Sequence, residues 1–131
     1  PVAYVYGDHN DNPLVFTTFD KALESAPGAT PIFHSDRGYQ YTSKEFRQKI
    51  VAAGMTQSMS RVAHCIDNGP MEGFWGIMKR EMYYGHKFKT KEELLQAIEE
   101  YMTYYTTKRV QRNLDVMTPM EYHEIKLKEA A

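Results

Sequence analysis

The chain has 131 residues, and its 42% hydrophobic and 25% charged content is that of one globular domain rather than a disordered segment. A single cysteine, Cys65, excludes an internal disulfide framework, and no apolar run approaches the length of a membrane span. The net charge of −1 argues against a chain that is basic overall, as DNA-binding domains often are, but it leaves room for local basic patches.

The first elements predicted along the chain are a strand and a helix. Residues 2–6 are rich in β-branched and aromatic side chains and predict a short strand. Asn12 can cap a helix with Pro13 at its first position, because that position needs no N–H donor. Apolar residues recur at helical spacing over 15–23, and Pro27-Gly28 ends this pattern.

A strand, a helix and a further strand follow. The apolar stretch 31–34 predicts a strand, and the polar residues 35–42 predict a loop. Ser43 is placed to cap the next helix, and Gly54 is the expected left-handed residue at its end. Residues 55–59 predict another short strand. The apolar face expected for the helix comprises Phe46, Ile50 and Val51.

The second half of the sequence predicts helices. Turn residues at 67–70 precede a helix over 71–83. Capping boxes at Thr90-x-x-Glu93 and Thr118-Pro119-x-Glu121 open two more helices. Strands that alternate with helices in this way predict an α/β fold, with a mixed sheet covered by flanking helices, in a single domain over 1–131.

Two carboxylates stand out, Asp36 and Glu72, with 35 residues between them. Asp36 directly follows a predicted strand, where open α/β sheets place their sites, and Glu72 lies in the first turn of a predicted helix. Taken alone, Asp36 is explained equally well as a turn former, and Glu72 as an acid that favours the helix dipole. Taken together, they offer the oxygen ligands of a metal-dependent phosphoryl-transfer site.

The helix around Glu72 has two contrasting faces. Trp75, Gly76 and Lys79 share the stripe of Glu72 at about 100° per residue. The opposite stripe, expected to face the core, comprises Phe74, Ile77 and Met78. The first stripe therefore faces solvent or a cleft, where Lys79 can contact a phosphate or serve as an ordinary surface lysine.

Basic residues near this helix are candidates for DNA contact. Lys79, Arg80 and Lys87 belong to one basic stretch, and residues 108–112 hold another. A solvated surface explains such patches equally well. Carboxylates with no spaced Cys/His cluster favour Mg²⁺ or Mn²⁺ over zinc, and His64-Cys65 is interpreted as part of a loop. A glycosidase acid/base pair is an alternative role for the two acids, but it leaves Lys79 without a function.

Several segments, in order over nearly the whole chain, are specific enough to identify relatives. They are His34-Ser35-Asp36-Arg37-Gly38, Gln40-Tyr41-Thr42-Ser43, Gln57-Ser58-Met59-Ser60-Arg61, Asp67-Asn68, Glu72 with Phe74-Trp75-Gly76, Lys79-x-Glu81, Tyr104-Tyr105, Lys108-Arg109 and Thr118-Pro119-x-Glu121. Together they resemble the catalytic core of bacterial insertion-sequence transposases, the group related to retroviral integrases.

The resemblance implies a ribonuclease H-like fold and a metal triad of Asp, Asp and Glu. It makes Asp36 the second acid and Glu72 the third, and it matches Lys79 to a lysine that approaches DNA ends. The family's first Asp lies on a central strand that would precede residues 2–6, so we expect a core truncated at its N-terminus, without that strand. We further expect a second copy of the chain to fill the open slot, through dimerisation or strand exchange.

The function implied is DNA transposition in the bacterial cytoplasm, in association with the nucleoid. The parent transposase would cleave DNA at element ends and join the 3′ ends to target DNA, with Mg²⁺ or Mn²⁺ as cofactor. The fragment by itself is expected to be inactive. Two alternatives remain: a non-catalytic DNA-binding or self-associating fragment, and a ribonuclease H-like nuclease without a joining step.

Overall fold

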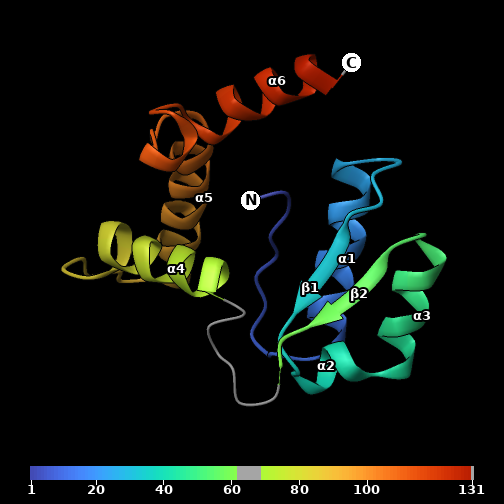
Figure 1. Ribbon diagram of the computed structural model, residues 1–131. Coiled ribbons are helices and arrows are strands. Elements are labelled where there is room, and N and C mark those ends of the chain that lie inside the picture. Colours follow the sequence, from blue (N-terminus) through green and yellow to red (C-terminus); the bar gives the residue numbers. More distant parts are fainter. Residues whose placement is uncertain (62–68, 131) are drawn as a thin grey trace. The chain divides into compact units, whose positions relative to one another are not determined.

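The computed structural model describes residues 1–61 and 69–130 (Figure 1). The chain divides into two compact units, Pro1–Glu72 and Gly73–Ala131, and each is described by itself below. The interpretation of His64-Cys65 as loop and the predicted turn residues 67–68 lie outside the described residues. That the chain forms a single domain over 1–131 stays a prediction.

The first unit is built on two parallel strands, β1 (Ile32–Ser35) and β2 (Thr56–Met59). Their register runs from Ile32 opposite Thr56 to Ser35 opposite Met59. The connection between them contains the short helix α2 (Tyr39–Thr42) and the helix α3 (Lys44–Ala52). Parallel strands end at the same edge of the sheet, so the residues after β1 and after β2 lie side by side. The α/β class is thus confirmed as helices with a small parallel sheet. In the described part of the chain, β1 and β2 make up the whole sheet, and the predicted mixed sheet stays a prediction.

Helix α1 (Asn12–Ser25) and helix α3 supply the core against β1. Asp11, rather than the predicted Asn12, caps α1, and its Oδ1 accepts a hydrogen bond from the Leu14 N–H at 3.0 Å. Ser43 caps α3 as predicted, with its Oγ accepting from the Phe46 N–H at 3.2 Å. The core is aromatic: Phe46 is fully buried, and the rings of Phe16, Phe19, Phe33 and Tyr41 surround it at centroid distances of 5.3–5.7 Å.

Residues 2–6 form no strand, contrary to the prediction. A β-rich composition becomes a strand only where a neighbouring strand takes up its backbone hydrogen bonds, and the β1–β2 pair does not extend to this segment. Contacts to α1 hold the segment instead. The Lys21 ammonium donates to the Tyr4 carbonyl at 3.2 Å and lies 5.4 Å from the centroid of the Tyr4 ring.

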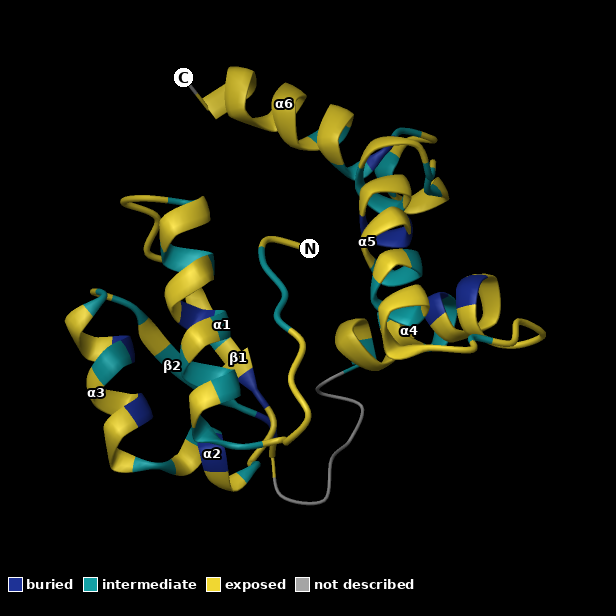
Figure 2. Cartoon of the chain, turned by 180° about the vertical axis from the view of Figure 1, so that it is seen from behind, coloured by how far each residue is buried: buried dark blue, intermediate teal, exposed yellow. Residues whose placement is uncertain are grey.

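The second unit is helical. Helix α4 (Gly69–Met78), which crosses the boundary between the units, continues directly into the π-helical turn η2 (Lys79–Tyr83). Helix α5 (Lys91–Thr107), the short 3₁₀ turn η3 (Arg112–Leu114) and helix α6 (Pro119–Ala130) follow. Buried residues of the unit alternate with exposed ones along α4, η2 and α5 (Figure 2). Its core consists of Met78, Met82 and Tyr101, with Phe74, Leu94, Ala97, Ile98 and Tyr105 packed around them.

Both predicted N-caps are confirmed, and the second is a full capping box. The Thr90 hydroxyl accepts from the Glu93 N–H at 3.2 Å, but Glu93 in return accepts from the Lys89 N–H at 2.8 Å rather than from the Thr90 N–H. At the start of α6 the exchange is reciprocal, because Thr118 Oγ1 accepts from the Glu121 N–H at 3.3 Å while Glu121 accepts from the Thr118 N–H at 2.8 Å. Across the described ranges, no helix combines the length and apolar character that crossing a lipid bilayer requires.

Candidate active site

Asp36 is the first residue after β1, and its side chain is exposed. One carboxylate oxygen, Oδ1, accepts a hydrogen bond from the Gly38 N–H at 2.8 Å, which fixes the carboxylate over the turn. A Cβ added at Gly38 would lie 3.0 Å from this same oxygen, which is tighter than nine in ten real Cβ contacts. Glycine at 38 therefore leaves room for the carboxylate to accept this bond, and among the described residues no hydrogen bond or ion pair engages Oδ2.

The backbone on both sides of Asp36 is anchored to the end of β2. The His34 ring bonds the hydroxyl of Ser58 on β2 at 3.0 Å and that of Ser60, just after β2, at 3.3 Å. The Ser60 N–H donates to the Ser35 carbonyl at 2.9 Å, and Arg37 Nε donates to the Ser60 carbonyl at 2.8 Å. These bonds turn the Arg37 guanidinium toward the β2 end, so that this cation helps to hold the loop that carries the acid.

Tyr41 lies close to this loop and packs on the aromatic core. Burial raises the pKa of its phenol, and the negative charge of Asp36 raises that pKa further. The phenol is therefore neutral at physiological pH and adds no negative charge next to Asp36.

Helix α4 presents the two faces that the sequence predicts. Met78 is buried in the core of the second unit, and Phe74 packs against that core. On the opposite stripe, Glu72 and Lys79 are exposed and Trp75 keeps 45% of its surface accessible. Within the described part of the chain, no hydrogen bond or ion pair engages the Glu72 carboxylate, so its oxygens can bind a ligand.

The helix changes its winding at Lys79. The Tyr84 N–H donates to the Lys79 carbonyl at 2.7 Å, an i to i+5 bond that defines the π turn η2. The predicted helix over 71–83 is thus observed as α4 plus η2. Lys79 and Arg80 lie on this turn and Lys87 on the segment after it, and all three side chains are exposed.

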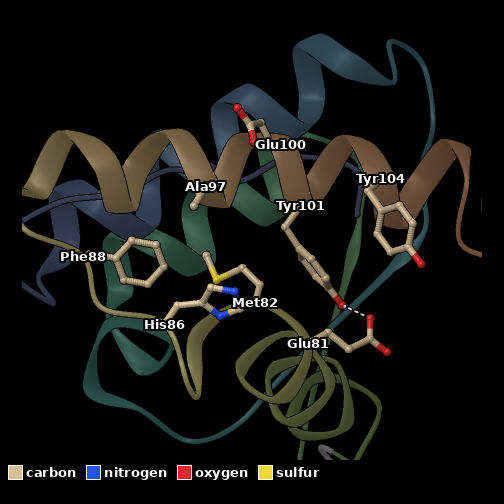
Figure 3. Close-up of a pocket in the computed structure, with 8 residues that line it drawn as sticks. All are labelled: Glu81, Met82, His86, Phe88, Ala97, Glu100, Tyr101 and Tyr104. Carbon is tan, nitrogen blue, oxygen red and sulfur yellow. Dashed lines mark hydrogen bonds between the residues drawn. The ribbon is translucent and has the colours of Figure 1, made fainter.

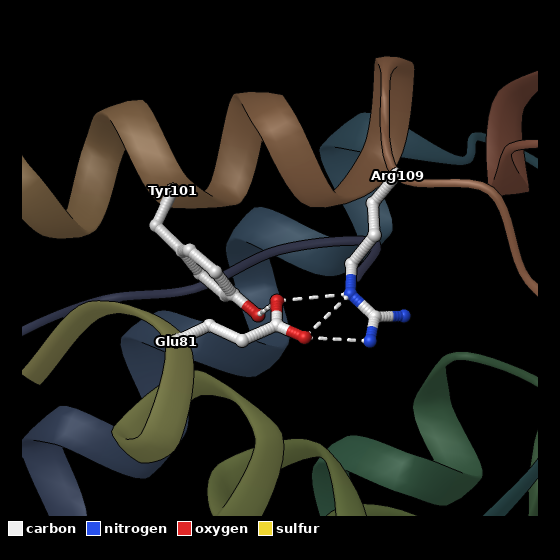
Figure 4. Close-up of polar contacts among 3 residues, drawn as sticks. All are labelled: Glu81, Tyr101 and Arg109. Carbon is white, nitrogen blue, oxygen red and sulfur yellow. Dashed lines mark hydrogen bonds and ion pairs between the residues drawn. The ribbon is translucent and has the colours of Figure 1, made fainter. Parts of the chain in front are cut away.

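A polar network that the sequence analysis missed joins η2 to α5 (Figure 4). Glu81 accepts from Arg109 Nη2 at 2.7 Å, from Arg109 Nε at 2.9 Å and from the Tyr101 hydroxyl at 2.8 Å. The hydrogen bonds from Arg109 lower the pKa of Glu81, and burial and the bond to Glu81 raise the pKa of Tyr101. Arg109 is therefore an internal partner of an acid, and it is not a free cation of the predicted basic stretch 108–112.

A groove of about 300 Å³ lies beside the same network (Figure 3). Its walls come from η2, the segment after it and α5, and its lining comprises Glu81, Met82, His86, Phe88, Ala97, Glu100, Tyr101 and Tyr104. No predicted site residue lines it. Two carboxylates and an apolar floor have the wrong character for a phosphate backbone, so we do not assign DNA to this groove.

The structure defines the surroundings of Asp36 and of Glu72 separately, on either side of residues 62–68. That the two carboxylates meet at one metal site stays a prediction. Over 1–61 and 69–130, no three His, Cys, Asp or Glu side chains gather closely enough to hold a metal ion by themselves.

The comparisons with known proteins give a consistent picture. Family models described as "Integrase core domain" match residues 1–65 and 72–127. The chain is 41% identical over 102 residues to an uncharacterized transposase-like protein of Haemophilus influenzae, covering 78% of this chain and 47% of that protein. It is 35% identical over 125 residues to an uncharacterized 31 kDa protein of insertion element IS600 from Shigella sonnei, covering 94% and 46%.

A third relative is a transposase for insertion sequence element IS904 from Lactococcus lactis, 38% identical over 94 residues, which cover 71% of this chain and 37% of that protein. The chain thus spans less than half the length of these relatives. No solved structure matches it.

Proposed function

Because this chain belongs to the integrase core family, we propose that it forms the catalytic core of a bacterial insertion-sequence transposase. The activity proposed for the protein that carries this core is cleavage of DNA at element ends, followed by joining of the 3′ ends to target DNA. Water is the nucleophile of the first step, and a 3′-hydroxyl is the nucleophile of the second. The names of the Haemophilus influenzae and IS904 relatives, transposase-like protein and transposase, favour transposition over a nuclease without a joining step.

One observation carries this proposal: the integrase core models match both stretches that hold the paired acids. Residues 1–65 include Asp36 and residues 72–127 begin at Glu72. Each acid also lies where a substrate can reach it, at the carboxyl end of a parallel strand and on the exposed stripe of α4. A ribonuclease H-like mixed sheet around this core is part of the proposal.

The donor set fits a hard divalent cation. Asp36 and Glu72 offer carboxylate oxygens, exposed and free of ion pairs among the described residues. Mg²⁺ is usually bound by one or two carboxylates together with waters and substrate phosphates, so Asp36 and Glu72 are suitable ligands for it. We therefore propose Mg²⁺, or Mn²⁺ in its place, as the cofactor that Asp36 and Glu72 hold.

When bound, such an ion lowers the pKa of the attacking oxygen and stabilises the leaving oxygen. The side chains of this chain contribute position and charge. The Gly38 N–H and the bonds of His34 and Arg37 to the β2 end hold Asp36 in one orientation. The exposed cations Lys79, Arg80 and Lys87 are proposed to bind DNA phosphates, which supplies affinity that falls with salt. A homo-oligomer on DNA is also part of the proposal.

A strand-transfer assay on the product of the complete reading frame tests this function. Glu72→Gln and Asp36→Asn keep the size of each side chain and remove its charge. We expect each to lower strand transfer at least about 100-fold, because the loss of even an outer partner of a metal ligand costs 10–100-fold. Glu124→Gln, at an exposed position on α6, is the matched control and should transfer strands like the wild type.

Two results would count against the proposal. Strand transfer that survives Glu72→Gln would remove Glu72 from the catalytic machinery. Products that contain cleaved ends but no joined 3′ ends, in the presence of Mg²⁺ and target DNA, would favour the nuclease.

A further inference from the structure

Trp75 is a large aromatic side chain that the core of its unit does not use. It keeps 45% of its surface accessible, while its neighbour Phe74 packs into the core against Tyr105 at a centroid distance of 4.9 Å. The indole ring touches Phe74 edge-on, at 5.3 Å and 63°, so the contact occupies an edge rather than stacking one ring on the other. An aromatic face held at the surface in this way is a stacking platform for another ring.

The helix surface around Trp75 is open. A Cβ added at Gly76 would meet no atom within 4 Å, so packing does not demand a glycine there. Glycine is one of the poorest helix formers, and α4 nevertheless has it next to the exposed indole. Position 76 therefore adds no side chain to the helix surface between Trp75 and Lys79, and this position is the open patch referred to below.

The charges along the stripe are ordered around the ring. Lys79 lies one turn further along the helix, about 5–6 Å away between Cβ atoms, and Arg80 adds a second exposed cation. Glu72 lies one turn in the other direction. Along the helix the stripe therefore presents an acid, an aromatic ring, a glycine and a cation, in this order: Glu72, Trp75, Gly76 and Lys79. Its basic end complements a phosphate.

We propose that Trp75 stacks on an unpaired or terminal base at the 3′ end of the DNA, while Lys79 holds a phosphate of the same strand. This inference rests on the proposed function and adds to it a second contact, made by the base rather than by the backbone. Trp75 and Lys79 are one helical turn apart, so their side chains leave neighbouring points of the helix surface and can contact the base and a phosphate of one strand. Bases inside a duplex are covered by their neighbours, so only an end or an unpaired base can present its face to Trp75.

Trp75 is the sole tryptophan of the chain, so its fluorescence reports this contact directly. The experiment titrates the 131-residue chain, in Mg²⁺ and low salt, with a short duplex that carries a single-stranded 3′ end. Binding is followed by anisotropy of labelled DNA, and stacking by quenching of tryptophan emission. The matched probe is the same duplex with abasic sites in place of the unpaired bases, which keeps every phosphate.

Three variants separate stacking from structure. Trp75→Ala should weaken binding of the 3′-tailed duplex about 5- to 140-fold, the range that removal of one base-stacking aromatic gives, whereas Trp75→Phe should stay within about threefold. Tyr104→Ala removes a ring of the same 45% exposure from α5 and should bind like the wild type. Should Trp75→Ala lose its helical signal, the quenching of the wild type and the behaviour of Trp75→Phe decide the question.

The outcomes distinguish this inference from the function on which it rests. Quenching by the tailed duplex, with weak or no quenching by the abasic one, supports stacking on Trp75. DNA that binds by anisotropy but leaves the emission unchanged overturns the stacking contact and leaves the proposed function standing. If the chain binds neither DNA at low salt, the contacts of Trp75 and Lys79 are both overturned, and the strand-transfer assay decides the proposed function separately.

Discussion

The network of Glu81, Tyr101 and Arg109 permits a quantitative prediction for the change Glu81→Gln. The amide keeps the shape of the side chain but removes the charge that accepts from Arg109 at 2.7 and 2.9 Å and from the Tyr101 hydroxyl at 2.8 Å. Exposed ion pairs contribute about 0–1 kcal/mol, and breaking a buried pair costs about 3–5 kcal/mol. The Glu81 and Arg109 side chains are 36% and 23% exposed, so solvent screens the pair in part, and we expect a loss of about 1–2 kcal/mol at pH 7.

The pH dependence of this loss follows from the direction of the Glu81 pKa shift. Hydrogen bonds from Arg109, and then from Tyr101, lower the pKa of Glu81 from its ordinary 4.5. A carboxylate with a lowered pKa stabilises the folded state fully above its unfolded pKa, and this stabilisation disappears as the pH falls through the folded value. The stability difference between wild type and Glu81→Gln should therefore be largest at neutral pH and shrink progressively below pH 4.5.

Urea denaturation followed by Trp75 fluorescence measures this quantity within the second unit, whether or not the two units unfold together. Arg109→Met and the double variant complete a cycle, in which the coupling energy should reach about 1 kcal/mol. Glu100→Gln, an exposed acid on α5, is the control and should stay within about 0.5 kcal/mol of the wild type. A loss for Glu81→Gln that is below 0.5 kcal/mol, or that persists unchanged in acid, would refute the reasoning.

Three further changes address the core, the open patch and the cations. Phe46→Ala should destabilise the first unit by about 3–5 kcal/mol in thermal or urea unfolding because Phe46 is fully buried, and Val51→Ala, at a 67% exposed position, should change it by less than about 0.5 kcal/mol. Gly76→Ala should raise the stability of the helix by up to about 1 kcal/mol and still weaken binding of 3′-tailed DNA. The control Gly73→Ala should raise stability without changing DNA binding. Equal DNA affinities for the two variants would contradict a role for the open patch. Lys79→Ala should lower the slope of log K against log salt by about 0.9, and an unchanged slope would exclude a phosphate contact.

Local chemistry allowed much of the fold to be predicted from the sequence. Ser43, Thr90 and Thr118 cap helices because their hydroxyls bond N–H groups three residues on, a relation visible in the sequence alone. Gly54 was expected in the left-handed region and has φ = 70°. The two faces of α4 follow from helical periodicity, and they are confirmed by a buried Met78 and an exposed Trp75.

Features that depend on partners distant in the chain could not be predicted in this way. Residues 2–6 have strand composition, but composition does not provide a neighbouring strand. Val51 was placed on the core face of α3 and is 67% exposed, since the helix turns only Phe46 and Ile50 fully into the core. Glu81 meets residues 20 and 28 positions away, and no spacing rule within one helix anticipates such contacts.

The candidate site shows the same division. Asp36 and Glu72 could be selected from their residue type and the sequence around them. For Asp36, the structure adds the contacts that hold it, namely the Gly38 N–H and the two serine hydroxyls bonded to His34. Glu72 lies on α4, the helix that crosses the boundary between the units, and its meeting with Asp36 stays a prediction for the strand-transfer assay.

The π turn at Lys79–Tyr83 makes the length of this segment as important as its composition. An i to i+5 bond takes up one residue more than an α-helical turn, so deletion of a single residue here would restore a regular helix. Every later side chain would then rotate by about 100°, and the glutamate would swing away from its tyrosine and arginine. The extra residue thus sets which side chains of η2 face α5. A homologue without it must connect these two segments through a different set of side chains.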